Sequence, residues 1–282
     1  RSRVALKTVG HVTGKALLRF KQEFRSVKGL AHPNLVSLGE LVILDHATFF
    51  TMELVDGVSL LEWTAGTRDD EDSTELDQAT ETLIEPTDAE MSPAPASRLG
   101  PRADLGRLRP ALRGLAEGVR ALHIARRLHL DLKPSNVMVR RDGSVVLLDF
   151  GLARRMHRHP EEPSAVIAGT PSYMAPEQVQ GMTPSEATDW YALGVILYRA
   201  LSGRLPFGGS PSAVLEQKVR DDPLPPSVFH PDAPADLEEL CMALLRRDPR
   251  TRPDESTILG TLGGAGITGA FAAMAHGAPP AA

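Results

Sequence analysis

The sequence contains a single cysteine, Cys241, among 282 residues, and aromatic residues make up only 5% of the chain. One cysteine can form neither an internal disulfide nor a cysteine-based zinc site. No apolar run reaches the roughly 18 residues that a membrane-spanning helix needs. The net charge of −5 gives no basic excess of the kind that nucleic-acid-binding domains carry. These features predict a globular chain of a reducing compartment, the cytoplasm by default, with no membrane span and no nucleic acid partner.

Two segments lack the patterns of folded structure. Residues 67–90 hold ten acidic residues and one base, Arg68, and proline-rich sequence follows. Such a composition cannot bury enough apolar surface to order the chain. We therefore interpret residues 67–104 as a disordered acidic insertion, a solvated spacer rather than a docking or regulatory segment. The Gly/Ala/Pro-rich residues 259–282 are interpreted as a linker towards a further C-terminal domain.

The remaining sequence places strands before helices. Apolar and β-branched runs predict strands, the first of them buried, over residues 4–9, 35–44 and 48–55. Apolar spacings of three and four predict helices over residues 15–29, 105–122, 185–201, 211–221 and 235–247. A hairpin is predicted at residues 137–148, where Asp142-Gly143 supplies the turn. This order predicts an α+β chain of two unequal lobes.

Polar residues that could take part in catalysis lie at both ends of the predicted hairpin. Asp131 and Asn136 precede it, and Asp149 follows it directly. Because a hairpin brings its two ends together, we expect these three side chains to converge.

The residue types suit phosphoryl transfer. Asn136 and Asp149 offer the hard oxygen ligands that Mg²⁺ prefers beside phosphate oxygens. Asp131 could orient a hydroxyl group and accept its proton. Lys133 on the same loop could neutralise charge on the transferring group.

Four motifs around these residues resemble those of eukaryotic-type protein kinases, most closely the bacterial serine/threonine kinases. HLDLKPSN at residues 129–136 resembles the catalytic loop H-R-D-L-x-x-x-N, and D-F-G is intact at residues 149–151. Ala175-Pro176-Glu177 matches A-P-E, and VALK at residues 4–7 resembles the V-A-I-K strand. The motifs occur in the family order on the expected elements.

The resemblance implies a bilobal protein kinase-like fold. It assigns residues 1–58 to an incomplete, β-rich small lobe and residues 59–258, with the acidic insertion, to a large helical lobe. It also implies a protein serine/threonine kinase that transfers the γ-phosphoryl group of ATP, with Mg²⁺, to a protein substrate.

The family assigns roles to individual residues. Lys7 would hold the α- and β-phosphates and pair with Glu23, the only acid on the 15–29 segment. Asp131 would be the catalytic base, with Asn136 and Asp149 holding Mg²⁺. Outside this context, Lys7 would be a strand lysine that extends its ammonium group to water, Glu23 would be a solvated helix acid, and the Asp and Asn residues would be turn caps.

The same resemblance predicts the nucleotide site. Met52 corresponds to the gatekeeper, and the backbone of Glu53 and Val55 would bind adenine. Ala5 and Met138 would lie on either side of the adenine ring.

Further residues are expected to shape the large lobe. Lys133 and the Gly169-Thr170-Pro171 segment resemble serine/threonine rather than tyrosine kinases, with Thr170 contacting Asp131 and Lys133. The resemblance also implies that Glu177 pairs with Arg252 and that Asp189 binds the catalytic-loop backbone, since a buried charge must be satisfied.

The sequence departs from the family in two places. Leu130 replaces the arginine of H-R-D, and the Gly-rich phosphate loop that precedes the strand lysine is missing, because only six residues precede Lys7. We expect an N-terminal truncation rather than a naturally short kinase. A pseudokinase or regulatory binding module without turnover is the alternative, and a small-molecule phosphotransferase is a weaker one.

Overall fold

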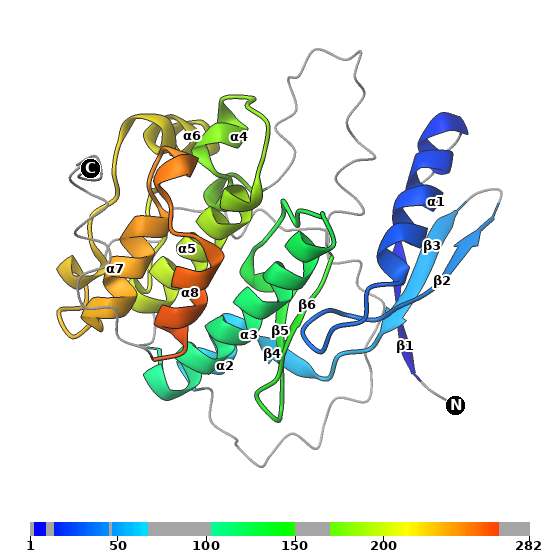
Figure 1. Cartoon of the computed structure of the whole chain (residues 1–282), viewed down its shortest axis with the longest axis horizontal. Coiled ribbons are helices and arrows are strands. Elements are labelled where there is room, and N and C mark those ends of the chain that lie inside the picture. Colours follow the sequence, from blue (N-terminus) through cyan, green and yellow to red (C-terminus); the bar gives the residue numbers. More distant parts are fainter. Residues whose placement is uncertain (1–2, 10–13, 45–46, 67–102, 150–169, 265–282) are drawn as a thin grey trace, which may run out of the picture.

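The computed structural model describes residues 3–9, 14–44, 47–66, 103–149 and 170–264 (Figure 1). A small sheet with one helix lies at one end of the molecule, and a larger body made mostly of helices lies at the other (Figure 1). This arrangement confirms the predicted division into a β-rich and a helical lobe.

The small lobe is a three-stranded antiparallel sheet covered by one helix. Its strand order is β1-β3-β2. The elements are β1 (Val4–Thr8), α1 (Gly14–Lys28), β2 (Leu38–Ile43) and β3 (Thr48–Glu53). Phe20 and Phe24 of α1 pack on Phe50 of β3, with ring centroids 6.5 and 5.5 Å from it. This aromatic cluster fixes the helix against one face of the sheet.

The prediction that the first strand is buried was wrong. Val4 and Leu6 are 55% and 57% exposed. Lys7 lies opposite Phe50 in the β1–β3 register and therefore shares the face that α1 covers. Val4 and Leu6 alternate to the other face of this edge strand.

The large lobe begins with a second small sheet of order β4-β5-β6. The strands are β4 (Gly57–Ser59), β5 (Val137–Arg140) and β6 (Val145–Leu147). The predicted hairpin is confirmed, with Val137 opposite Leu147 and Gly143 in a left-handed turn at φ 82°. Because β4 pairs with β5, Gly57 and Val58 belong to this sheet rather than to the small lobe.

Helices make up the rest of the lobe. They are α2 (Leu60–Ala65), α3 (Leu105–Ile124), α4 (Pro176–Val179), α5 (Glu186–Ser202), α6 (Pro211–Arg220), α7 (Ala235–Leu244) and α8 (Glu255–Leu262). As predicted, α5 starts after Ser185, ends at Gly203 with φ 69°, and is buried along most of its length. It packs against α3 and α7 at the centre of the lobe (Figure 1). None of the helices in the described part of the chain is long and apolar enough to cross a bilayer.

Two segment boundaries differ from the sequence prediction. The linker predicted for 259–282 starts too early, because α8 continues to Leu262, whose side chain is only 2% exposed. The acidic insertion predicted for 67–104 ends too late, because Asp104 caps α3 by accepting from the Gly106 N–H at 2.8 Å. Residues 67–102 and 265–282 lie outside the described residues.

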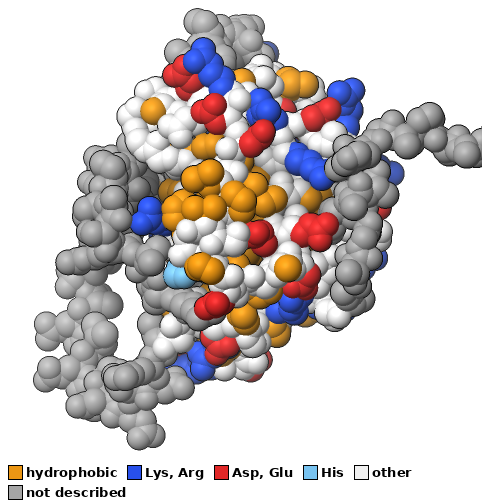
Figure 2. Space-filling view, turned by 90° about the vertical axis from the view of Figure 1, so that its left-hand side faces the viewer, with side chains coloured by type: hydrophobic (Ala, Val, Ile, Leu, Met, Phe, Trp, Pro, Cys, Tyr) orange, Lys and Arg blue, Asp and Glu red, His pale blue; other side chains and the backbone are white. Residues whose placement is uncertain are grey.

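Figure 2 shows the end of the helical lobe that faces away from the small sheet. Hydrophobic side chains gather near its centre, and acidic and basic side chains are mixed around them. The described residues therefore form no basic patch on this face.

Candidate active site

Asp189 of α5, a residue that is 1% exposed, binds the backbone of the predicted catalytic loop at residues 129–136. One carboxylate oxygen accepts from the His129 N–H and the other from the Leu130 N–H, both at 2.8 Å. His123 of α3 adds a third hydrogen bond, with Nε2 2.8 Å from Asp189 Oδ2. These bonds confirm the predicted contact and hold Leu130 in a left-handed conformation at φ 62°.

His129 joins this loop to the end of the hairpin. Its Nε2 lies 2.9 Å from the Leu148 carbonyl oxygen, and its Nδ1 lies 3.2 Å from the Asp131 backbone nitrogen. The first contact requires a proton on the ring and the second requires a lone pair, so the ring is neutral. Burial also lowers the pKa of His129. The imidazole therefore fixes the backbone of Asp131 relative to β6.

Asn136 and Asp131 are in direct contact. The Asn136 Nδ2 donates to the Asp131 carbonyl oxygen at 2.8 Å and to its Oδ2 at 3.2 Å. Because both bonds use the amide nitrogen, Asn136 Oδ1 faces a different direction and can act as a ligand. Lys133 Nζ lies 3.8 Å from Asp131 Oδ2 and 3.4 Å from Thr170 Oγ1. The amide of Asn136 and the ammonium group of Lys133 thus both lie within 3.8 Å of the Asp131 carboxylate.

Asp149 lies at the same end of the ribbon as Asn136. The Leu148 N–H donates to the Asn136 carbonyl at 2.8 Å, next to Asp149, which has φ 55°. Lys7 Nζ of β1 forms an ion pair with Asp149 Oδ2. The structure therefore places the strand lysine of the small lobe against the carboxylate that follows the hairpin.

The predicted Lys7–Glu23 pair stays a prediction. Glu23 is half-buried on α1, and Lys7 forms an ion pair with Asp149. Phe150 and Gly151 of the D-F-G motif lie outside the described residues.

The predicted nucleotide residues lie on β1, β3 and β5 and on the chain that joins the lobes. Ala5 is opposite Met52 in the β1–β3 register, and Met138 is on β5. The Glu53 carboxylate pairs with Arg140 at 2.5 Å, and the Glu53 N–H donates to the Ser37 carbonyl oxygen at 2.9 Å. Within the described residues, the Val55 N–H has no hydrogen-bond acceptor, so this donor is available.

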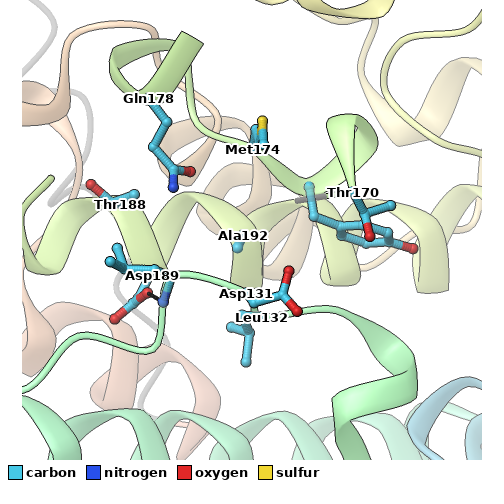
Figure 3. A pocket seen from close by; sticks show the side chains of 10 residues that line it. Asp131, Leu132, Thr170, Met174, Gln178, Thr188, Asp189 and Ala192 are labelled. Atoms are coloured by element: carbon cyan, nitrogen blue, oxygen red, sulfur yellow. Dashed lines mark hydrogen bonds between the residues drawn. The ribbon is translucent and has the colours of Figure 1, made fainter. Parts of the chain in front are cut away.

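A small hollow lies between Asp131 on the catalytic loop and the segment that begins at Thr170 (Figure 3). Asp131 and Leu132 form one wall, whereas Thr170, Met174 and Gln178 project from the opposite wall (Figure 3). Residues of α5 contribute Asp189 and Ala192. The hollow has a volume of about 10 Å³, which is room for one water-sized group such as a hydroxyl, and Asp131 lines it.

The predicted pair of Glu177 and Arg252 is also present. Two parallel hydrogen bonds of 2.8 Å join the guanidinium group to the carboxylate. The pair anchors α4, which continues the wall of the hollow.

Few side chains of this site could bind a metal ion. The described residues contain no group of three or more His, Cys, Asp or Glu side chains that could hold a metal ion. Asn136 and Asp149 offer one amide oxygen and one carboxylate, which suits a hard cation whose remaining ligands come from phosphates and water. The donor chemistry fits Mg²⁺ bound together with a nucleotide.

The hairpin thus joins the loop that carries Asp131 to the Asp149 carboxylate, between a small sheet and a helical body. The protein kinase domain model matches residues 1–261, and the chain belongs to this family. The sequence is 32% identical over 261 residues to the serine/threonine-protein kinase Pkn1 of Myxococcus xanthus, covering 89% of this chain and 32% of that protein. It is 32% identical over 243 residues to the serine/threonine-protein kinase PkaB of Streptomyces coelicolor, covering 83% and 49%.

The fold is similar to that of a solved kinase. The twitchin kinase region from C. elegans matches with a TM-score of 0.68 and 26% identity, over 92% of this chain and 40% of that chain. The chain spans about a third to a half of the curated relatives named above. The predicted family and fold class are confirmed, and the comparisons give no support to the pseudokinase alternative.

Sequence reasoning missed two buried residues near the site, His123 and Lys218. The Leu-His spacing at the end of α3 reads as ordinary amphipathic helix, and only its contact with Asp189 reveals what His123 does. Lys218 interrupts the apolar stripe of α6, four residues after Val214, and that interruption is the one signal the sequence offers.

Proposed function

We propose that the chain transfers the γ-phosphoryl group of ATP to serine or threonine hydroxyl groups of protein substrates. One observation carries the proposal, namely the contact of Asp131 with Asn136 and Lys133 beside the ion pair of Lys7 and Asp149. The proposal includes Mg²⁺ as cofactor, the cytoplasm as location and a longer parent protein with a further C-terminal domain. The single buried cysteine fits a reducing compartment.

The nucleotide would bind between the lobes. The Glu53 carbonyl and the Val55 N–H would hold the adenine, with Ala5 and Met138 on its two faces. Lys7 would bind the α- and β-phosphates. Asn136 Oδ1 and Asp149 would hold Mg²⁺, which supplies charge neutralisation at the phosphates when it is bound.

The acceptor hydroxyl would enter the hollow and donate a hydrogen bond to Asp131. As its oxygen attacks the γ-phosphorus, Asp131 takes the proton, a new P–O bond forms and the bond to the ADP oxygen breaks. Lys133, 3.8 Å from Asp131 Oδ2, is placed to stabilise negative charge on the transferred group. Its contact with Thr170 keeps the ammonium on the acceptor side of the loop.

A radiolabelled ATP assay on the purified chain with serine- and threonine-containing peptides tests the proposal. Asp131→Asn keeps the size of the side chain but removes the proton acceptor, and we expect a loss of about 10²–10⁴-fold in kcat. Chelation of Mg²⁺ should abolish transfer, and added Mg²⁺ should restore it.

The matched control is Asp142→Asn in the hairpin turn, where the exposed carboxylate bonds only to Ser144 among the described residues. This variant should retain the wild-type rate. Equal incorporation by wild type and Asp131→Asn would reject the assignment of the base, and the absence of any Mg²⁺-dependent transfer by the wild-type chain would reject the proposed activity.

A further inference from the structure

Lys218 of α6 is a buried lysine that no part of the proposed chemistry uses. It is 1% exposed, and it is the only buried lysine of the residues that the structure describes. Its Nζ lies 4.9 Å from the centre of the Tyr191 ring and 5.9 Å from that of Phe207. Burying an ammonium group is costly, so a lysine in such a place needs compensating contacts.

Backbone oxygens supply these contacts. Lys218 Nζ donates to the carbonyl oxygens of Ser172 at 2.8 Å and Met174 at 2.9 Å. Its third neighbour is the Tyr191 hydroxyl at 3.5 Å. All three acceptors are neutral, so the described residues give this ammonium no carboxylate partner. Burial, helped by the charge of Arg252, lowers the pKa of Lys218 to about 7.

The two carbonyl groups flank Tyr173, in the middle of the wall that faces Asp131. This wall comprises the 3₁₀ turn at Pro171–Tyr173 with its neighbours Thr170 and Met174. Thr170, Tyr173 and Met174 line the hollow, and Figure 3 shows Thr170 and Met174 across from Asp131. The Tyr173 hydroxyl accepts from Arg199 of α5 at 2.8 Å. The wall is therefore held from behind by two basic side chains, Arg199 from α5 and Lys218 from α6.

We propose that Lys218 is a positioning residue for the protein substrate, because it holds the 170–174 wall at the distance from Asp131 that an acceptor hydroxyl requires. This inference rests on the proposed kinase function. The nucleotide residues lie on β1, β3, β5 and the connection between the lobes, none of which Lys218 contacts. Loss of the lysine should therefore weaken binding of the peptide and leave binding of ATP almost unchanged.

The test compares Lys218→Gln with Arg220→Gln on the same helix. Arg220 is an exposed residue whose side chain pairs with Glu216 at 2.5 Å, so this control also removes one positive charge from α6. For Lys218→Gln we expect the peptide KM to rise about tenfold or more, as for the loss of a charged hydrogen bond. The ATP KM should change less than about twofold, and Lys218→Arg should recover most of the peptide KM.

Hydrogen exchange of the 171–176 segment gives a readout that needs no activity. Its amides should exchange about tenfold faster in Lys218→Gln than in Arg220→Gln, while the amides of β1 and β3 stay unchanged. If the wild-type chain phosphorylates no peptide, the proposed function fails, and exchange alone judges the role of Lys218.

Three results would overturn the inference. The first is an equal rise of both KM values in Lys218→Gln, and the second is unchanged exchange of the 171–176 segment. The third is a failure of both Lys218→Gln and Lys218→Arg to fold at 25 °C, because the lysine would then support the whole lobe rather than the wall.

Discussion

Removal of one partner from the buried pair of Glu177 and Arg252 should destabilise the large lobe severely. The two side chains are 2% and 0% exposed, so water cannot replace a lost partner. The guanidinium group also donates to the carbonyl oxygens of Ala187 and Arg246 at 2.8 Å each. Arg252→Met would leave the Glu177 carboxylate buried without a cationic partner among the described residues, although it would still accept from the Thr188 hydroxyl at 2.9 Å. Such uncompensated burial costs about 3–5 kcal/mol.

The double variant Glu177→Leu/Arg252→Met should cost less than the sum of the two single changes. Once both charges are gone, no uncompensated ion is left in the core, and apolar side chains fill part of the volume. Urea unfolding of the wild type, the two single variants and the double variant measures the difference. Additive losses, or a loss below about 1 kcal/mol for Arg252→Met, would refute the argument that desolvation dominates this pair.

The pair should also make stability depend on acid. Burial alone would raise the pKa of Glu177, but the hydrogen bond and charge of Arg252 outweigh it and bring the pKa below its usual 4.5. The folded state therefore binds the proton less readily than the unfolded state. This contribution to stability is fully present above pH 4.5 and is lost as the pH falls through the lowered value. Arg252→Met should abolish that part of the acid sensitivity.

Two more predictions concern packing and pH. Gly57→Ala should destabilise the chain by about 1–3 kcal/mol, since an added Cβ would lie 2.2 Å from the Val139 carbonyl oxygen. Urea unfolding measures the loss, with Gly29→Ala as the control because a Cβ added at Gly29 would have no atom within 4 Å. Equal losses in the two variants would refute the clash. For Lys218, whose pKa falls from 10.5 to about 7, the unfolded state binds more protons between these values. Unfolding free energy should therefore rise from pH 7 to 10 by at most about 4 kcal/mol, and a similar rise in Lys218→Met would contradict this origin.

Local signals predicted the elements that position the site. Asp142-Gly143 specified the hairpin, and Ser185 and Gly203 marked both ends of α5. The contacts of Asp189 and Glu177 followed from the family motifs, because each motif occupies a fixed place in the fold. These features depend on residues close in sequence or on spacings that the family imposes.

The features that the sequence did not predict depend on distant partners. Whether Val4 and Leu6 are buried is decided by which face of the sheet α1 covers, and the strand itself does not record this. The Gly-rich residues after 259 suggested a linker, yet Leu262 is buried in the core of the lobe and extends α8. Lys218 interrupts the apolar stripe of α6, and only the tertiary structure shows that its ammonium group is buried against two backbone carbonyl groups.

In the proposed site, two buried side chains bind backbone groups rather than each other. Asp189 accepts from two N–H groups of the catalytic loop, and Lys218 donates to two carbonyl groups of the facing wall. The distance between Asp131 and the wall therefore depends on how α5 and α6 pack. Because Asp189 holds residue 130 through its N–H, the Leu130 side chain that replaces the family arginine leaves this anchor intact. The substitution therefore removes a positively charged side chain from the loop, while the backbone hydrogen bonds to Asp189 are present.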